Sequence, residues 1–215
     1  MGLFAKFKKD RGEKRPHMGY ERAIAILRGA IEKRSTYNPA FGLTGSIDDK
    51  TYEFMNSNLY KNLCLLYLGA QKFDFAKRYA EKRLAIVEDC PVASRVLGTC
   101  LLNEYVDGGN IIANIVENNE PRVLKETVRS FRNCLRADEE DYFCLFGIAL
   151  ASFLYNIWAD SHGCDTDQTL VIEGQGCLTK LIHHAKESEE AELMRRHFWG
   201  YFEIVKRFIE GQPIS

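Results

Sequence analysis

The most constraining feature of this chain is an uncharged, strongly apolar stretch, "YFCLFGIALASFLYNIWA", at residues 142–159. A helix of this length spans about 27 Å, slightly less than the ~30 Å hydrocarbon core of a membrane. Asn156 would need a polar partner in lipid, and Asp160 follows the stretch where an interfacial cation is expected. We therefore expect the innermost helix of a folded domain, with a single membrane span as the alternative.

The composition favours a globular protein in a reducing compartment. The chain has 215 residues, of which 46% are hydrophobic and 27% charged, enough for a substantial core. Its net charge of −1 gives no bias toward nucleic acid or anionic lipid. The seven cysteines are an odd number, include no CxxC pair and lie mostly among apolar residues, which does not suit a disulfide framework. We expect a cytoplasmic protein that binds no nucleic acid and needs no cofactor.

The chain is expected to form one helical domain, residues 19–215, behind a basic tail, residues 1–18. Residues 1–17 contain six basic and two acidic side chains. We expect this tail to be flexible, and a contact with a membrane surface or an acidic partner stays open.

Apolar residues three and four positions apart predict helices along most of the domain. Proline, glycine and polar clusters predict loops at 35–50, 107–110 and 161–176, and residues 111–120 are ambiguous. No run alternates with the period of a strand. We predict an all-α fold of about eight or nine helices, stacked as antiparallel hairpins.

Three of the predicted helices share a pattern of a large apolar residue, a small residue and, three positions later, a bulky one. These segments are "YKNLCLLY" at 60–67, "RVLGTCL" at 95–101 and "FCLFGIAL" at 143–150. They resemble the first helix of a tetratricopeptide repeat (TPR), and the segments at 20–30, 73–76 and 127–134 are similar to its second helix. Arg83 departs from the family pattern, which has a small residue there. The resemblance implies helix pairs that stack because one pair cannot bury both of its faces alone.

The resemblance also implies a function. First helices of the TPR family line a concave groove that binds peptides, so we expect a non-catalytic interaction or scaffolding module for a protein or peptide, and self-association is possible. Lys61 and Arg95 lie 34 residues apart, at equivalent repeat positions, and Asn58 lies one turn before Lys61. These three residues are the expected contacts with a carboxylate or a peptide backbone. Leu65 occupies the place of an asparagine in the family's dicarboxylate clamp, which argues against chaperone tails as partners.

Two alternatives come from different classes of protein. The first is a helical metal-binding protein or enzyme that uses residues 160–184, with His162, Cys164 and His183 as candidate ligands, because thiol and imidazole bind zinc. Their spacing matches no known metal motif, and no phosphate-binding loop or nucleophile motif occurs in the chain. We therefore expect neither a metal nor catalysis. The second alternative is an adaptor tethered to a membrane through residues 142–159.

Overall fold

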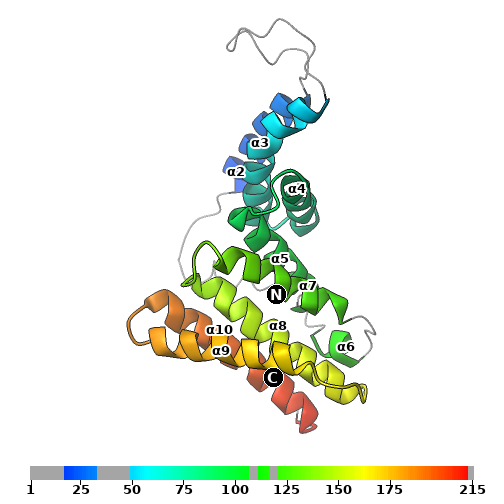
Figure 1. Ribbon diagram of the computed structural model, residues 1–215, viewed down its shortest axis with the longest axis vertical. Coiled ribbons are helices and arrows are strands. Elements are labelled where there is room, and N and C mark those ends of the chain that lie inside the picture. Colours follow the sequence, from blue (N-terminus) through cyan, green and yellow to red (C-terminus); the bar gives the residue numbers. More distant parts are fainter. Residues whose placement is uncertain (1–16, 33–48, 107–110, 117–120, 213–215) are drawn as a thin grey trace, which may run out of the picture.

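The computed structural model describes residues 17–32, 49–106, 111–116 and 121–212 (Figure 1). Those residues form nine helices and no strand, which confirms the predicted all-α fold. In chain order the helices are α2 (His17–Glu32), α3 (Asp49–Gly69), α4 (Phe73–Ile86), α5 (Pro91–Val106), α6 (Ile111–Val116), α7 (Arg122–Leu135), α8 (Tyr142–Ser161), α9 (Gln168–His184) and α10 (Glu189–Ile209).

Helices that follow one another in the chain pack side by side, so that the molecule is an elongated stack (Figure 1). The most extensive contacts join α3 with α4, α5 with α7, and α8 with α9, while α4 also packs on α5 and α7 on α8. At one end α2 packs on α3, and at the other α10 packs against both α8 and α9. The predicted stacking of adjacent helix pairs is confirmed.

Two predicted segments fall mostly outside the described residues. Of the tail at 1–18, only the last two residues are described, as the start of α2. Of the loop at 35–50, only the last two residues are described, as the start of α3. The glycine-rich loop at 107–110 also lies outside the described ranges.

The loop predicted at 161–176 was wrong, because α9 begins at Gln168 and continues to His184. The Asp167 carboxylate accepts a hydrogen bond from the Leu170 amide and caps the helix, so the connection from α8 is short. Gly174, which we interpreted as a loop residue, instead permits close packing of α9 on α8. A Cβ atom at that position would lie 2.5 Å from the Ser152 Cβ.

Two clusters of buried apolar side chains meet at α5. The N-terminal core joins α2, α3, α4 and the first half of α5, and the C-terminal core joins the last part of α5 to α6 through α10. Val96 and Cys100 belong to the N-terminal core, whereas Leu102, Tyr105 and Val106 belong to the C-terminal core. Because α5 faces both cores, most of its residues are apolar, without a clear polar side.

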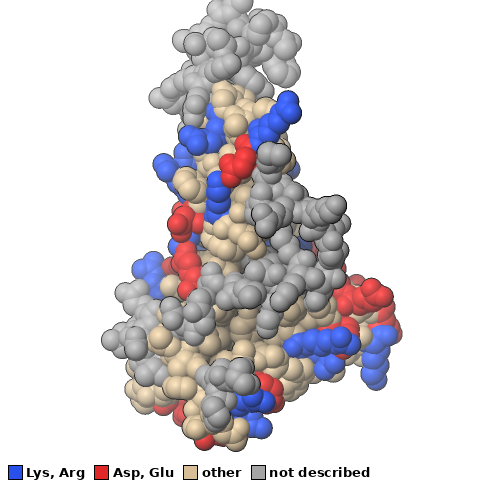
Figure 2. All heavy atoms as spheres, turned by 180° about the vertical axis from the view of Figure 1, so that it is seen from behind, with Lys and Arg blue, Asp and Glu red and all other residues tan. Residues whose placement is uncertain are grey.

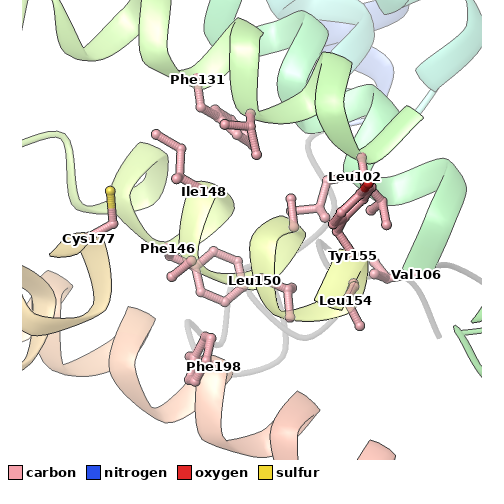
Figure 3. Close-up of a cluster of buried hydrophobic side chains, with 14 of the residues drawn as sticks. Leu102, Val106, Phe131, Phe146, Ile148, Leu150, Leu154, Tyr155, Cys177 and Phe198 are labelled. Carbon is pink, nitrogen blue, oxygen red and sulfur yellow. The ribbon is translucent and has the colours of Figure 1, made fainter. Parts of the chain in front are cut away.

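The apolar stretch that opened the sequence forms α8 and lies at the centre of the C-terminal core (Figure 3). It is the one described helix long and apolar enough, by length and composition, to cross a membrane, and 78% of its apolar window is buried inside the fold. Phe146 is fully buried, and Phe153 is covered by Phe198 and Phe202, with ring centroids 5.8 and 5.2 Å away. The prediction of an internal helix is therefore confirmed for the fold as described.

Phe131 of α7 fixes the approach of three helices. Its ring packs against Gly98 of α5 and Gly147 of α8, and a Cβ added at either glycine would press into the ring. These two glycines are the small residues of the pattern quoted at 95–101 and 143–150. The small residue of the pattern thus has a packing role at these two positions, because the absence of both side chains leaves room for the Phe131 ring.

Candidate functional site

One face of α3 carries a stripe of four side chains, three of them exposed and one, Lys61, half-buried. Phe54, Asn58, Lys61 and Leu65 follow one another at spacings of four, three and four, so they lie along one side of the helix. Phe54 is 65% exposed and Leu65 45% exposed, and both flank the polar pair in the middle. We call these four residues the α3 stripe.

The opposite side of α3 builds the N-terminal core. Leu63, Cys64 and Tyr67 belong to this core, and Tyr60 is also buried. Tyr67 stacks on Phe75 and Tyr79 of α4, with ring centroids 5.1 and 5.5 Å away. This packing holds α3 in a fixed rotation and so turns the α3 stripe outward.

Lys61 differs from Lys72 and Lys77, two other lysines at this end of the molecule. The Lys72 ammonium is paired with Glu21, and the Lys77 ammonium lies 3.0 Å from Glu104. Within the described ranges, no carboxylate oxygen lies within ion-pair distance of the Lys61 ammonium, whereas the backbone carbonyl of Lys61 accepts from the Cys64 thiol. Lys61 is half-buried, and its ammonium has no ion-pair partner within the described ranges.

Arg95, the third predicted contact residue, takes part in packing between helices. Its Nη1 lies 2.8 Å from Oδ2 of Asp141, the N-cap residue of α8, and its guanidinium lies over the Phe143 ring at 5.2 Å. The Arg95 side chain is 42% exposed, whereas that of Asp141 is 9% exposed. Arg95 therefore ties α5 to the start of α8, and only its exposed part remains for a partner.

Arg83, the departure from the TPR pattern, has a similar structural role. Its Nη1 donates to the Ser57 hydroxyl of α3 at 2.5 Å, and its Nε lies 3.5 Å from the Cys90 sulfur. Ser57 and Cys90 are both buried. A long basic side chain thus replaces the close helix contact that a small residue would give.

A cluster that our sequence interpretation missed lies at the turn from α7 to α8. The sulfur atoms of Cys134 and Cys144 and a carboxylate oxygen of Asp141 lie within 4.8 Å of one another. Asp141 Oδ1 accepts from the Cys144 amide at 3.0 Å, and Cys134 Sγ lies 3.8 Å from Asp141 Oδ2. We interpreted both cysteines as plain apolar residues, and only the packing of α7 on α8 brings them together.

The two thiols of this cluster influence each other. A hydrogen bond from the Cys144 thiol lowers the pKa of Cys134, and the same hydrogen bond, together with burial, raises the pKa of Cys144. Elsewhere burial dominates: it raises the pKa of the Cys64 and Cys100 thiols to about 12. Thiols of the latter kind stay protonated and act as small apolar side chains.

The candidate ligands at 160–184 do not come together. His162 stacks on Trp158 at 4.8 Å between ring centroids, and its Nδ1 lies 2.9 Å from the Trp158 carbonyl oxygen. Cys164 and His183 are exposed, and the His183 ring lies beside that of His184. Across the part of the chain that the structure describes, the one group of three potential metal ligands is Cys134, Asp141 and Cys144. The metal alternative at 160–184 thus gains no geometric support.

No protein-family model, no curated protein and no solved structure matches this chain. The chain is an all-helical protein whose helices pack as adjacent pairs, and its likeness to TPR proteins rests on the residues quoted above.

Proposed function

We propose that this protein is a non-catalytic interaction module that binds an acidic, apolar segment of a partner protein on the α3 stripe. The observation that carries the proposal is the exposure of two large apolar side chains, Phe54 and Leu65, on either side of Lys61. Exposed apolar groups in one row are typical of a surface that a partner covers. The TPR-like pattern in the sequence supports the same kind of function.

The dimensions of the α3 stripe suit a short peptide segment. Leu65 follows Phe54 by eleven positions, which corresponds to about 17 Å at 1.5 Å per residue, or three helical turns. Covering the exposed parts of Phe54 and Leu65 would contribute about 1–2 kcal/mol each. A carboxylate on Lys61 would fix the register and speed association more than it would raise the affinity.

The distribution of charge supports a protein partner rather than nucleic acid. On the face seen in Figure 2, basic and acidic side chains are interspersed along the described part of the molecule. Nucleic-acid binding favours a continuous basic surface. The seven free cysteines support a reducing compartment such as the cytoplasm.

The titratable groups give little support to catalysis. The raised pKa values of Cys64 and Cys100 suit packing rather than nucleophilic attack. The remaining ion pairs, such as Arg132 with Glu173 and Lys125 with Asp167, link neighbouring helices at the surface. We therefore propose binding, with enzymatic activity in second place.

The test uses the full chain with a photoreactive amino acid in place of Asn58. A partner that crosslinks from this position is identified, and its crosslinked segment is synthesised as a fluorescent peptide. Affinity is then measured by anisotropy for the unmodified protein and for the variants Lys61→Glu and Leu65→Asp. We expect each variant to bind at least about ten-fold more weakly, which corresponds to about 1.4 kcal/mol.

Matched controls carry the same changes on α9 or just beyond it, at the other end of the molecule (Figure 1). Lys186→Glu matches the charge change, and Ile172→Asp matches the apolar change, because Ile172 is 67% exposed. Arg95→Glu is a poor test because it would also break the ion pair with Asp141. Equal affinities for the α3 and α9 variants would contradict the proposal, as would a crosslinked segment without apolar and acidic residues.

A further inference from the structure

A pair of buried thiols lies where α7 ends and α8 begins. Cys134 is in the last turn of α7, and Cys144 is in the first turn of α8. The Cys144 amide donates a hydrogen bond to Asp141, the N-cap residue of α8. The two sulfur atoms lie within 4.8 Å of each other, and both cysteines are buried. A disulfide requires about 2.05 Å between sulfur atoms, so side-chain rotation and a small shift of the turn would be needed to join them.

The hydrogen bond between the two thiols favours ionisation of Cys134, whereas burial and the nearby Asp141 carboxylate oppose it. Cys144 lies at the N-terminus of α8, where the helix carries partial positive charge. The Cys144 thiol donates to Cys134 and lowers the pKa of Cys134, and the positive charge of Arg95, which is paired with Asp141, acts in the same direction to a smaller extent. A thiolate beside a second thiol is the arrangement that disulfide formation requires.

A metal ion fits the same atoms less well. Two sulfurs and a carboxylate are suitable zinc ligands. However, Asp141 Oδ2 already accepts from the Arg95 guanidinium at 2.8 Å, and its Oδ1 accepts from the Cys144 amide at 3.0 Å. A divalent cation on this carboxylate would lie next to the positive charge of Arg95 and would displace these bonds.

We propose that Cys134 and Cys144 form a reversible disulfide when the protein meets a peroxide. The Cys134 thiolate attacks one peroxide oxygen, the O–O bond breaks, and the leaving hydroxide takes a proton to become water. The Cys144 sulfur then attacks the sulfur of the Cys134 sulfenic acid. The S–O bond breaks, the hydroxyl leaves with the Cys144 proton as a second water, and the S–S bond forms. The two thiols lose two electrons and two protons, and the peroxide is reduced to two water molecules.

The connection between the two helices gives a route to the buried pair. Residues 136–140 are all exposed, so a local opening of this turn would admit a molecule as small as hydrogen peroxide. The disulfide would tie the end of α7 to the start of α8 and restrict the turn between them. Cellular thiols would reverse it, which fits a transient bond in a reducing compartment.

The experiment treats the full chain with hydrogen peroxide and maps its cysteines by mass spectrometry. The exposed Cys164 is changed to Ser beforehand, so that links between chains do not form. Free thiols are blocked with N-ethylmaleimide under denaturing conditions, and the chain is cut with trypsin and chymotrypsin. We expect a linked pair of peptides that contain Cys134 and Cys144, lighter by two hydrogen atoms and separated again by dithiothreitol.

Three variants and a measurement of bound zinc make the outcome decisive. Cys144→Ser should lose the link, whereas the matched variant Cys100→Ser, also at a fully buried cysteine, should retain it. If Cys134 and Cys144 still react with maleimide after peroxide treatment, as Cys64 should, their thiols have stayed free. That result would overturn the proposal and leave both cysteines as packing residues. One zinc ion per chain in native mass spectra, lost on Cys134→Ser, would also overturn it in favour of a metal site. The maleimide result is read on the parent chain, whether or not a variant folds.

Discussion

At the scale of single residues, the close approach of α7 and α8 depends on the absent side chain of Gly147. Its position faces the Phe131 ring so closely that even a methyl group would overlap the ring atoms. The ring cannot retreat, because Gly98 of α5 lies on its other side and Phe131 is fully buried. Interiors packed at this density respond to one added carbon atom.

We therefore predict that Gly147→Ala destabilises the protein by about 1–3 kcal/mol, as overpacking does in other cores. The matched control is Gly200→Ala, within α10, where nothing lies within 4 Å of the added Cβ. That variant should gain about 0.5–1 kcal/mol, because alanine favours a helix over glycine. Chemical denaturation measures both changes. A stabilising effect of Gly147→Ala would contradict the packing of Phe131 described above.

The residue scale is also where sequence interpretation reached its limit. Asn58, Lys61 and Arg95 were selected by repeat spacing, but spacing does not reveal that Arg95 is paired with Asp141, 46 positions away. The proximity of Cys134 to Cys144 depends on the angle between two helices, which no local pattern encodes. Sequence alone thus located residues with a potential role and missed the partners that decide the role.

At the scale of helices, sequence periodicity was sufficient wherever a helix has one apolar face. An apolar stripe predicted α10, made of Met194, Phe198, Tyr201, Phe202, Val205 and Ile209. Met194, Phe198 and Val205 are buried, Tyr201 and Phe202 are half-buried, and Ile209 is 65% exposed. The first half of α9 was missed because its glycines and nearby acids are typical of loops. Gly174 lies within α9, where the absence of a side chain leaves room for Ser152 of α8. This contact becomes visible only in three dimensions.

The start of α10 gives a prediction about pH. Glu192 lies in the first turn, and hydrogen bonds from Arg195 and Arg196 lower the pKa of its carboxyl to about 2, from an ordinary value of 4.5. Because the folded pKa is depressed, the carboxylate stabilises the protein above pH 4.5, and this contribution is lost as the pH falls toward 2. An NMR titration of the Glu192 carboxyl should therefore have its midpoint well below 4.5.

Matched variants test whether the two arginines, and not other charges of α10, lower the pKa of Glu192. Replacing both Arg195 and Arg196 with Gln should return the midpoint most of the way to its ordinary value, whereas Lys206→Gln, in the last turn, should leave it unchanged. High salt should raise the midpoint, since these pairs are at the surface. A normal midpoint in the parent chain would show that the hydrogen bonds of Glu192 do not persist in solution.

At the scale of the whole molecule, α5 contributes to both cores and α8 is the helix on which the rest of the C-terminal core packs. The N-terminal and C-terminal cores both use α5, and individual helices are buried in them to very different extents. Fourteen residues of α8 are buried, whereas Ile24 is the one buried residue among the described side chains of α2. Local opening should therefore be frequent at the α2 end and rare at α8.

Hydrogen exchange on the full chain, in buffer without detergent, tests this architecture most directly. We predict that the amides of α8, and those of α5 and α7 that face it, exchange most slowly, while those of α2 exchange faster. Such an order would place the apolar helix inside protein and leave the α3 stripe on a more open end of the stack. Exchange in α8 as fast as in α2, or protection of α8 that appears only when lipid or detergent is added, would contradict the fold described here.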